Sequence, residues 1–319
     1  MRNREATPLG ANALYLSAIL LLVAVNSVTG LALQGGGTVA YYVALGLAEI
    51  LLAMVPALIY VAARGLPMAE TFHFRKTPAR QIVVAALLPI AGYPVLMYIN
   101  TAWMGFLMLL GIEPLGTELP GLNSGIGILM ALLSVGLAPA LAEEMLFRGP
   151  ILAGYKRHGK WFAVCATGVL FALMHGQLEG VWSLAALGIL LGLMTWESGS
   201  IWPSVVFHFM NNAVAVLLSA GISWLTRNVP QFAGAASAEV TVAQAAVSTW
   251  TLLPFAVLGG LAFWGLWVLF RRGCRGGGLR GGAVRPCQGW GVGEWLLLCL
   301  SLVIVGALIA SALLMGLLL

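Results

Sequence analysis

Long apolar runs constrain the fold of this chain more than any other feature of its sequence. A helix needs roughly 20 apolar residues to cross the hydrocarbon core of a bilayer, and the sequence holds about nine such runs. Apolar residues make up 61% of the 319 residues and charged residues only 8%, whereas a soluble domain carries about 25% charged residues. We therefore predict an all-α, polytopic transmembrane bundle of about eight or nine helices.

The runs divide the chain into three predicted regions. Three spans fall in residues 1–125, four in residues 126–218 and two in residues 219–319. A Gly/Arg-rich linker, 271–293, joins the last two spans. The loop at 64–80 mixes basic residues with Phe and Met, so a plain basic loop and a segment lying in the membrane interface explain it equally well. The predicted spans are 11–33, 39–63, 81–110, a run starting near 126, 161–174, 181–196, 201–220, 250–270 and 295–319.

Basic side chains fall unevenly between the predicted loops. With the N-terminus in the cytoplasm, fifteen of the sixteen Lys and Arg residues lie on the cytoplasmic side, and only Arg227 lies outside. This asymmetry predicts a cytoplasmic N-terminus in a multi-pass integral membrane protein, in the plasma membrane of a prokaryote or the endoplasmic reticulum of a eukaryote. The net charge of +5 has the same explanation, so the expected partner is the lipid bilayer and not a nucleic acid.

Several classes of active site are excluded by the residues that are missing. All eleven acidic residues are Glu, which rules out an aspartyl protease. The four cysteines have no CxxC spacing, so neither a disulfide framework nor a cysteine zinc site is expected. The chain lacks GxSxG, and Ser124 follows a sequence without the GxSG spacing of rhomboid proteases. Seryl chemistry is therefore not expected.

Ionisable groups inside apolar runs are costly and usually functional. Glu144 and Arg148 are four residues apart, so they face each other on a helix, while Glu143 points about 100° away. His175 ends the fifth run. His208 and Asn212 share one face of the seventh.

These groups are expected at similar depths in the bilayer. If the fourth helix continues through Gly149 to about Tyr155, Glu143 lies ~18 Å from the cytoplasmic side, at 1.5 Å per residue. The same count puts His175 at ~22 Å and Asn212 at ~18 Å. A free carboxylate, an imidazole and a His/Asn pair at one depth predict a site that activates water and stabilises an oxyanion.

Each of these signals also has a structural explanation. Glu144 and Arg148 can form an ion pair that only fixes helix packing, and His208 with Asn212 can supply interhelical hydrogen bonds. Glu49, near the middle of the second span, can pair with Arg148, line a cavity or hydrogen-bond while protonated. We favour a structural partnership for Glu49.

The three motifs together resemble a known family. Glu143-Glu144-x-x-x-Arg148, then Phe171-x-x-x-His175, then His208-x-x-x-Asn212 is similar to the CPBP family, which includes type II CAAX prenyl endopeptidases and related bacteriocin-processing, Abi-like and self-immunity membrane proteins. The resemblance covers residues 126–218, under a third of the chain. It implies an intramembrane protease that acts on a membrane-associated peptide or protein, a prenylated CaaX C-terminus being one such substrate.

The resemblance also implies a role for each motif residue. Glu143 and His175 would activate the attacking water, His208 and Asn212 would stabilise the oxyanion, and Glu144 with Arg148 would support the site. Whether a metal takes part stays open at this point. Glu143, His175 and His208 are a ligand set that suits catalytic zinc, yet the HExxH of zincins is absent.

Two other functions compete with proteolysis. A non-proteolytic immunity or scaffold protein could use the same fold, in which case Glu143 would be dispensable. A proton-coupled transporter could use Glu49, Glu143 and the His residues as its proton path.

Overall fold

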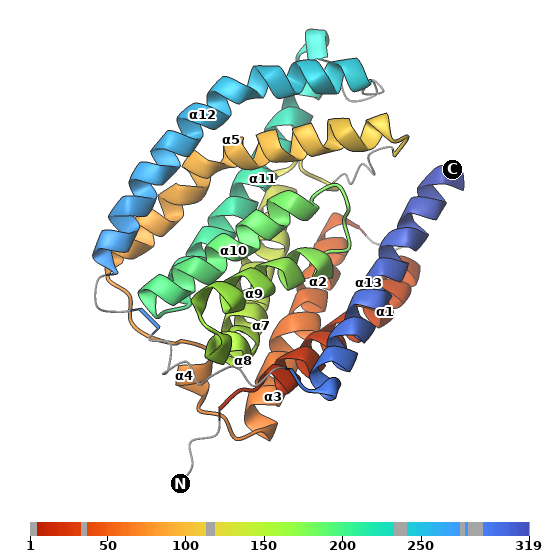
Figure 1. Ribbon diagram of the computed structural model, residues 1–319. Helices are drawn as coiled ribbons and strands as arrows, with labels where there is room; N and C mark the ends of the chain where they lie inside the picture. Colours follow the sequence, from red (N-terminus) through yellow and green to blue (C-terminus); the bar gives the residue numbers. More distant parts are fainter. Residues whose placement is uncertain are drawn as a thin grey trace.

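The computed structural model describes residues 5–32, 37–112, 119–232, 241–274, 278–279 and 290–318. Eight of its helices are long and apolar enough to cross a membrane, which confirms the predicted all-α fold (Figure 1). The predicted fifth span, α9, has 15 residues and is shorter than these eight. The cytoplasmic N-terminus and the three-region division remain predictions.

The elements follow the predicted spans, and two of the long runs, 38–63 and 125–158, are divided into several elements. Their bounds are α1 (Pro8–Ala32), α2 (Thr38–Glu49), η1 (Ile50–Met54), α3 (Val55–Ala63), α4 (Met68–Thr71), α5 (Ala79–Leu109), α6 (Gly125–Ala131), η2 (Leu132–Leu137), α7 (Ala138–Leu146), η3 (Phe147–Ile151), α8 (Leu152–Tyr155), η4 (Lys156–His158), α9 (Lys160–Met174), α10 (Val181–Ser198), α11 (Trp202–Asn228), η5 (Pro230–Phe232), α12 (Val242–Gly273) and α13 (Val292–Leu318).

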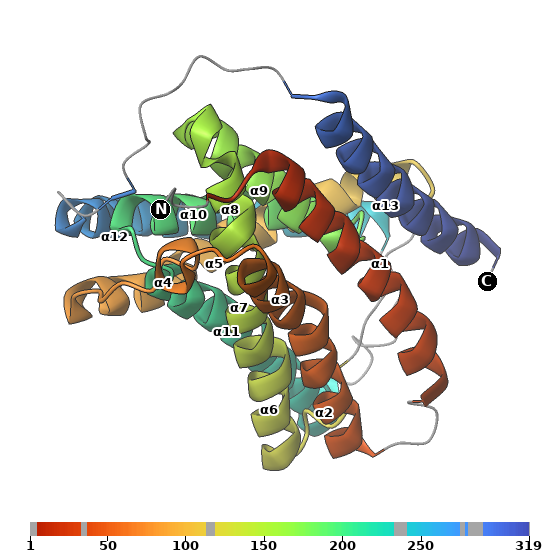
Figure 2. The same ribbon diagram turned by 90° about the horizontal axis from the view of Figure 1, so that it is seen from below.

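The helices pack as pairs around a central group. α12 lies along α5 on one side and α13 lies along α1 on the other, with α7, α9, α10 and α11 between them (Figures 1 and 2). Close approach of α9 and α10 depends on two glycines, because a Cβ on Gly188 would lie 2.8 Å from the carbonyl oxygen of Gly168. Small residues of this kind allow membrane helices to pack backbone against backbone.

Three π-helical segments, η1, η2 and η3, interrupt the helices nearest the candidate site. Gly149 within η3 has non-helical backbone angles of φ −84° and ψ −117°, and it is followed by Pro150, which cannot donate a backbone hydrogen bond. The fourth helix is therefore kinked just after Arg148. The helical run continues past Tyr155 to His158, as expected, but the kink at Gly149 means that a count of 1.5 Å per residue does not hold across it. The depth of Glu143 in the bilayer remains a prediction.

The loop at 64–80 is folded against the protein core. His73 is buried, and its Nδ1 lies 2.8 Å from the carbonyl oxygen of Arg148. That carbonyl is available because Leu152 N–H donates to the carbonyl of Phe147, five residues earlier, instead of to that of Arg148. On its other side, the carbonyl of His73 accepts from the backbone N–H of Ile201 at 3.1 Å. The loop thus supports the kink in the fourth helix and the start of α11.

The predicted linker, 271–293, lies mostly outside the described residues. Of the four cysteines, Cys165, Cys274 and Cys299 are free thiols, and Cys287 lies outside the described residues.

Candidate active site

A buried ion pair lies at the base of the site. Arg148 Nη1 is 3.0 Å from Glu144 Oε1, and both side chains are fully buried. This confirms the pairing predicted from their spacing of four residues. Arg148 Nη2 donates to the carbonyl of Gly188 on α10 at 2.7 Å, and the guanidinium lies 4.9 Å from the ring centroid of Phe171. Arg148 therefore links α7, α9 and α10.

Glu144 also orients an imidazole on α11. His208 Nδ1 lies 3.1 Å from Glu144 Oε1, the same oxygen that Arg148 contacts. A carboxylate can only accept, so this contact puts a proton on Nδ1 of His208. The contact aims the opposite ring nitrogen, Nε2, at Glu143.

Glu143 lies between two imidazoles. Its Oε1 is 3.8 Å from His175 Nε2, and its Oε2 is 3.7 Å from His208 Nε2. Both separations are too long for a direct hydrogen bond. Glu143 Oε2 is buried and has no hydrogen-bond partner within the described part of the chain. The carboxylate thus lies beside two ring nitrogens but forms a direct hydrogen bond with neither.

The end of α9 fixes the orientation of His175. His175 is the residue that follows α9, and its Nδ1 lies 2.8 Å from the carbonyl oxygen of Phe171. That oxygen is among the last carbonyls of the helix, which have no partner within it. Because a carbonyl only accepts, the proton of the neutral ring is on Nδ1, and a lone pair on Nε2 faces Glu143.

His175 is the most exposed of the three side chains. Its side chain is 27% exposed, against 7% for Glu143 and 3% for His208. Of these three groups, His175 therefore offers the most accessible approach to the carboxylate.

Glu49 belongs to this cluster rather than to Arg148. It interacts electrostatically with Glu143, His175 and His208, whereas the carboxylate paired with Arg148 is that of Glu144. Of the three roles considered for Glu49, an ion pair with Arg148 is not formed among the described residues. α2 ends at Glu49, and the π-helical segment η1 that follows it packs on α7.

Asn212 is held in place by the backbone carbonyl of Val135. This carbonyl lacks its usual helical donor because the residue four positions later is Pro139. Pro139 has no N–H to give to the carbonyl of Val135, four residues earlier. Asn212 Nδ2 donates to this carbonyl at 2.9 Å. Its oxygen accepts from Asn211 Nδ2 at 3.3 Å. The contacts of Asn212 are thus with Val135 and Asn211, while its helix neighbour His208 contacts the two carboxylates.

Within the described residues, no group of three or more His, Cys, Asp or Glu side chains is arranged to hold a metal ion. The hypothesis that Glu143, His175 and His208 are zinc ligands stays a prediction.

Sequence reasoning missed two contributors to the site, the carbonyl of Gly188 and the loop residue His73. Neither belongs to a motif. The only sequence signal at Gly188 is its small size within an apolar helix, and the only one at His73 is an ionisable side chain in a loop.

Comparison with known proteins finds a family match over the region that contains Glu143, His175 and His208. Residues 125–214 match the sequence model of the family described as "Type II CAAX prenyl endopeptidase Rce1-like". An "Uncharacterized 24.3 kDa protein" of Escherichia coli is 27% identical over 135 residues, which span 40% of this chain and 62% of that protein. This chain thus covers less than two thirds of that relative. No solved structure matches the chain.

Proposed function

Because residues 125–214 form an Rce1-like domain of the CPBP family of type II CAAX prenyl endopeptidases, we propose that this multi-pass protein is an intramembrane endopeptidase. Its substrate is a membrane-associated protein or peptide, and a prenylated CaaX C-terminus belongs to this class. The observation that carries the proposal is the buried Glu143 carboxylate, 3.8 Å from His175 Nε2 and 3.7 Å from His208 Nε2.

Glu143 and His175 activate the nucleophile. Two polar atoms 3.8 Å apart suit a water molecule that hydrogen-bonds to both. The lone pair on His175 Nε2 accepts one water proton and orients the molecule. Glu143 removes the other proton as the water oxygen attacks the carbonyl carbon of the scissile peptide bond.

His208 and Asn212 stabilise the oxyanion that this attack creates. Glu144 accepts from Nδ1 of His208, and in the doubly protonated ring Nε2 donates to the oxyanion. Asn212 Nδ2 has two hydrogens and spends one on Val135, which leaves one for the oxyanion. Arg148 balances the charge of Glu144.

Collapse of the tetrahedral intermediate completes the hydrolysis. The carbon–nitrogen bond breaks, and Glu143 returns the proton that it took from water to the leaving amine. The products are a new carboxyl terminus and a new amino terminus, and no other reactant is consumed.

Cleavage by the purified protein in lipid tests the proposal. A quenched fluorescent farnesylated CaaX peptide and its unprenylated twin are offered to wild type, Glu143→Gln and Glu70→Gln, each with and without a chelator. Glu70 is exposed on α4, so Glu70→Gln controls for the loss of one carboxylate. We expect cleavage by wild type and Glu70→Gln, none by Glu143→Gln, and no effect of the chelator.

Each contrary result has a separate meaning. Equal cleavage by wild type and Glu143→Gln would overturn the mechanism. Loss of activity with the chelator would show that a metal ion takes part in the reaction. Preference for the farnesylated peptide would support a CAAX protease. Preference for its unprenylated twin would instead indicate that the substrates are unlipidated membrane peptides. A folded wild type that cleaves neither would favour the non-proteolytic immunity or scaffold function.

A further inference from the structure

A cavity lies beside the residues that follow His175. It has a volume of about 660 Å³ and lies between α5, the start of α10, α11 and Ile309 of α13. Its wall includes residues 176–180, which directly follow His175, the most exposed of the three clustered side chains. A substrate that approaches Glu143 past His175 therefore passes the wall of this cavity.

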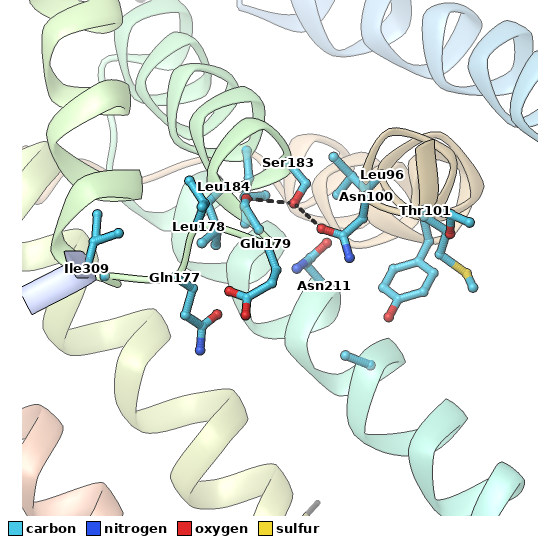
Figure 3. A pocket seen from close by; sticks show the side chains of 16 residues that line it. Leu96, Asn100, Thr101, Gln177, Leu178, Glu179, Ser183, Leu184, Asn211 and Ile309 are labelled. Carbon is cyan, nitrogen blue, oxygen red and sulfur yellow. Dashed lines mark hydrogen bonds between the residues drawn. The ribbon is translucent and has the colours of Figure 1, made fainter. Parts of the chain in front are cut away.

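Asn211 presents an unpartnered oxygen in the cavity. Its side chain lines the cavity, and its Oδ1 is buried without a hydrogen-bond partner in the described part of the chain. The residue as a whole is 9% exposed. An amide oxygen buried in this way costs about 1–3 kcal/mol until a donor reaches it. In Figure 3 the amides of Asn211 and Asn100 face each other, one from α11 and the other from α5.

The other lining groups define the chemistry of the ligand. The walls combine the aliphatic side chains of Leu96, Leu184 and Leu187 with the neutral polar groups of Asn100 and Ser183. Ser183 Oγ donates to Asn100 Oδ1 at 3.4 Å. Glu179 is the one charged residue among the described lining residues, and none is Lys or Arg. A peptide segment with apolar side chains, backbone amides and no acidic side chain fits walls of this kind.

We propose that this cavity is the substrate's backbone-recognition subsite, in which Asn211 Oδ1 accepts a hydrogen bond from a peptide N–H. This inference rests on the proposed protease function and adds a specificity-determining residue to it. Asn211 is three residues beyond His208, ~4.5 Å along the helix axis at 1.5 Å per residue. Because one residue of extended peptide spans about 3.3–3.6 Å, the recognised N–H belongs to a residue within two positions of the scissile bond.

Backbone-ester substrates test this hydrogen bond directly. In a series of quenched peptides, one amide at a time within two positions of the scissile bond is replaced by an ester, which removes the N–H. Each peptide is offered to wild type, Asn211→Leu and Asn228→Leu, a control on the same helix outside the cavity. We expect one ester to lower kcat/KM of wild type and of the control about five- to tenfold, mainly through KM. Asn211→Leu should lose a similar amount on the all-amide peptide and nothing further on that ester.

The coupled measurement separates recognition from a structural effect of Asn211 on Asn212. If Asn211 acted only by positioning Asn212, Asn211→Leu would lower kcat, and the ester losses would be equal in variant and wild type. Equal ester losses in both proteins, or wild-type activity in Asn211→Leu, would overturn the proposal.

Binding distinguishes failure of the subsite from failure of the protease function. Fluorescence anisotropy of the labelled amide and ester peptides is measured on Glu143→Gln and on Glu143→Gln/Asn211→Leu. Weaker binding of the ester by the single variant alone supports the subsite even if wild type cleaves nothing. Identical binding of amide and ester by both proteins rejects it.

Discussion

His208 Nδ1 and Arg148 Nη1 contact the same oxygen of Glu144, at 3.1 Å and 3.0 Å. This shared oxygen fixes the imidazole on α11 relative to the carboxylates on α7. Glu144 is therefore more than a packing partner for Arg148, because it also sets which ring nitrogen of His208 faces Glu143.

Removing the charge of Glu144 should reduce turnover more than substrate binding. Glu144→Gln removes the negative charge beside His208 Nδ1, so the doubly protonated ring that donates from Nε2 to the oxyanion loses its countercharge. When the partner of an active-site His is changed in this way elsewhere, kcat falls by up to about 10⁴-fold, and we expect a loss on the order of 100-fold or more here. Steady-state kinetics on the quenched peptide measure it, with Glu70→Gln as control. A kcat within twofold of wild type would contradict the assigned role.

The buried ion pair should be costly to break and cheaper to remove whole. Arg148→Met leaves Glu144 buried without its countercharge, which typically costs about 3–5 kcal/mol. The double variant Arg148→Met/Glu144→Leu removes both charges and should recover much of that stability while remaining inactive. Thermal unfolding of the three proteins in one detergent tests this. A double variant less stable than Arg148→Met would show that the pair itself stabilises the fold.

His73 should make stability depend on pH in the acidic range. The residue lies outside the candidate spans. Burial lowers its pKa to about 4, although its bond to the Arg148 carbonyl acts in the opposite direction. Between that value and its ordinary pKa of about 6.5, the unfolded chain binds a proton that the folded chain does not. Stability should therefore fall as pH decreases through this window.

Replacing His73 by Gln should remove this component of the pH dependence. Gln has no proton to gain, and its amide can still donate to the carbonyl of Arg148. The stability difference between pH 7 and pH 4.5 should shrink by up to about 3 kcal/mol, since each pKa unit is worth about 1.4 kcal/mol. Unfolding midpoints of both proteins across that range provide the measurement. Parallel pH profiles would exclude His73 as the titrating group.

The glycine contact between α9 and α10 should tolerate no added methyl group. A Cβ at Gly188 would lie 2.8 Å from Gly168 O and 2.9 Å from Gly168 Cα, so Gly188→Ala should destabilise the protein by about 1–3 kcal/mol. Gly265→Ala, on α12 with open space around the added carbon, is the matched control and should be neutral or stabilising. Equal melting temperatures for the two variants would argue against a close crossing of these helices.

The sequence predicts the helices and the ionisable groups inside them, because both depend on strong local signals. Apolar runs of membrane length can form little other than helices, and Glu143, His175 and His208 stand out as ionisable groups within them. The structure brings these three side chains together, as the motifs predict. The functional roles assigned to them, and to Asn212, remain predictions.

The features that escape the sequence depend on backbone geometry. Pro139 and Pro150 predict irregular helices, but they do not predict which backbone carbonyls nearby lack a helical donor. Only the structure shows that Asn212 uses the carbonyl of Val135 and that His73 uses that of Arg148. Long-range partners of this kind have no fixed spacing along the chain, so no motif records them.

The hydrogen bond from Arg148 to the Gly188 carbonyl makes the alignment of the candidate site depend on the packing of α10. The guanidinium that holds Glu144 also joins α7 to α10, at the level where α10 crosses α9 glycine to glycine. A detergent or a lipid environment that merely loosens this crossing would release Arg148, and with it the alignment of His208. The proposed proteolytic activity should then be lost before the helical content falls. A sample with a fully helical circular dichroism spectrum would be inactive in that case.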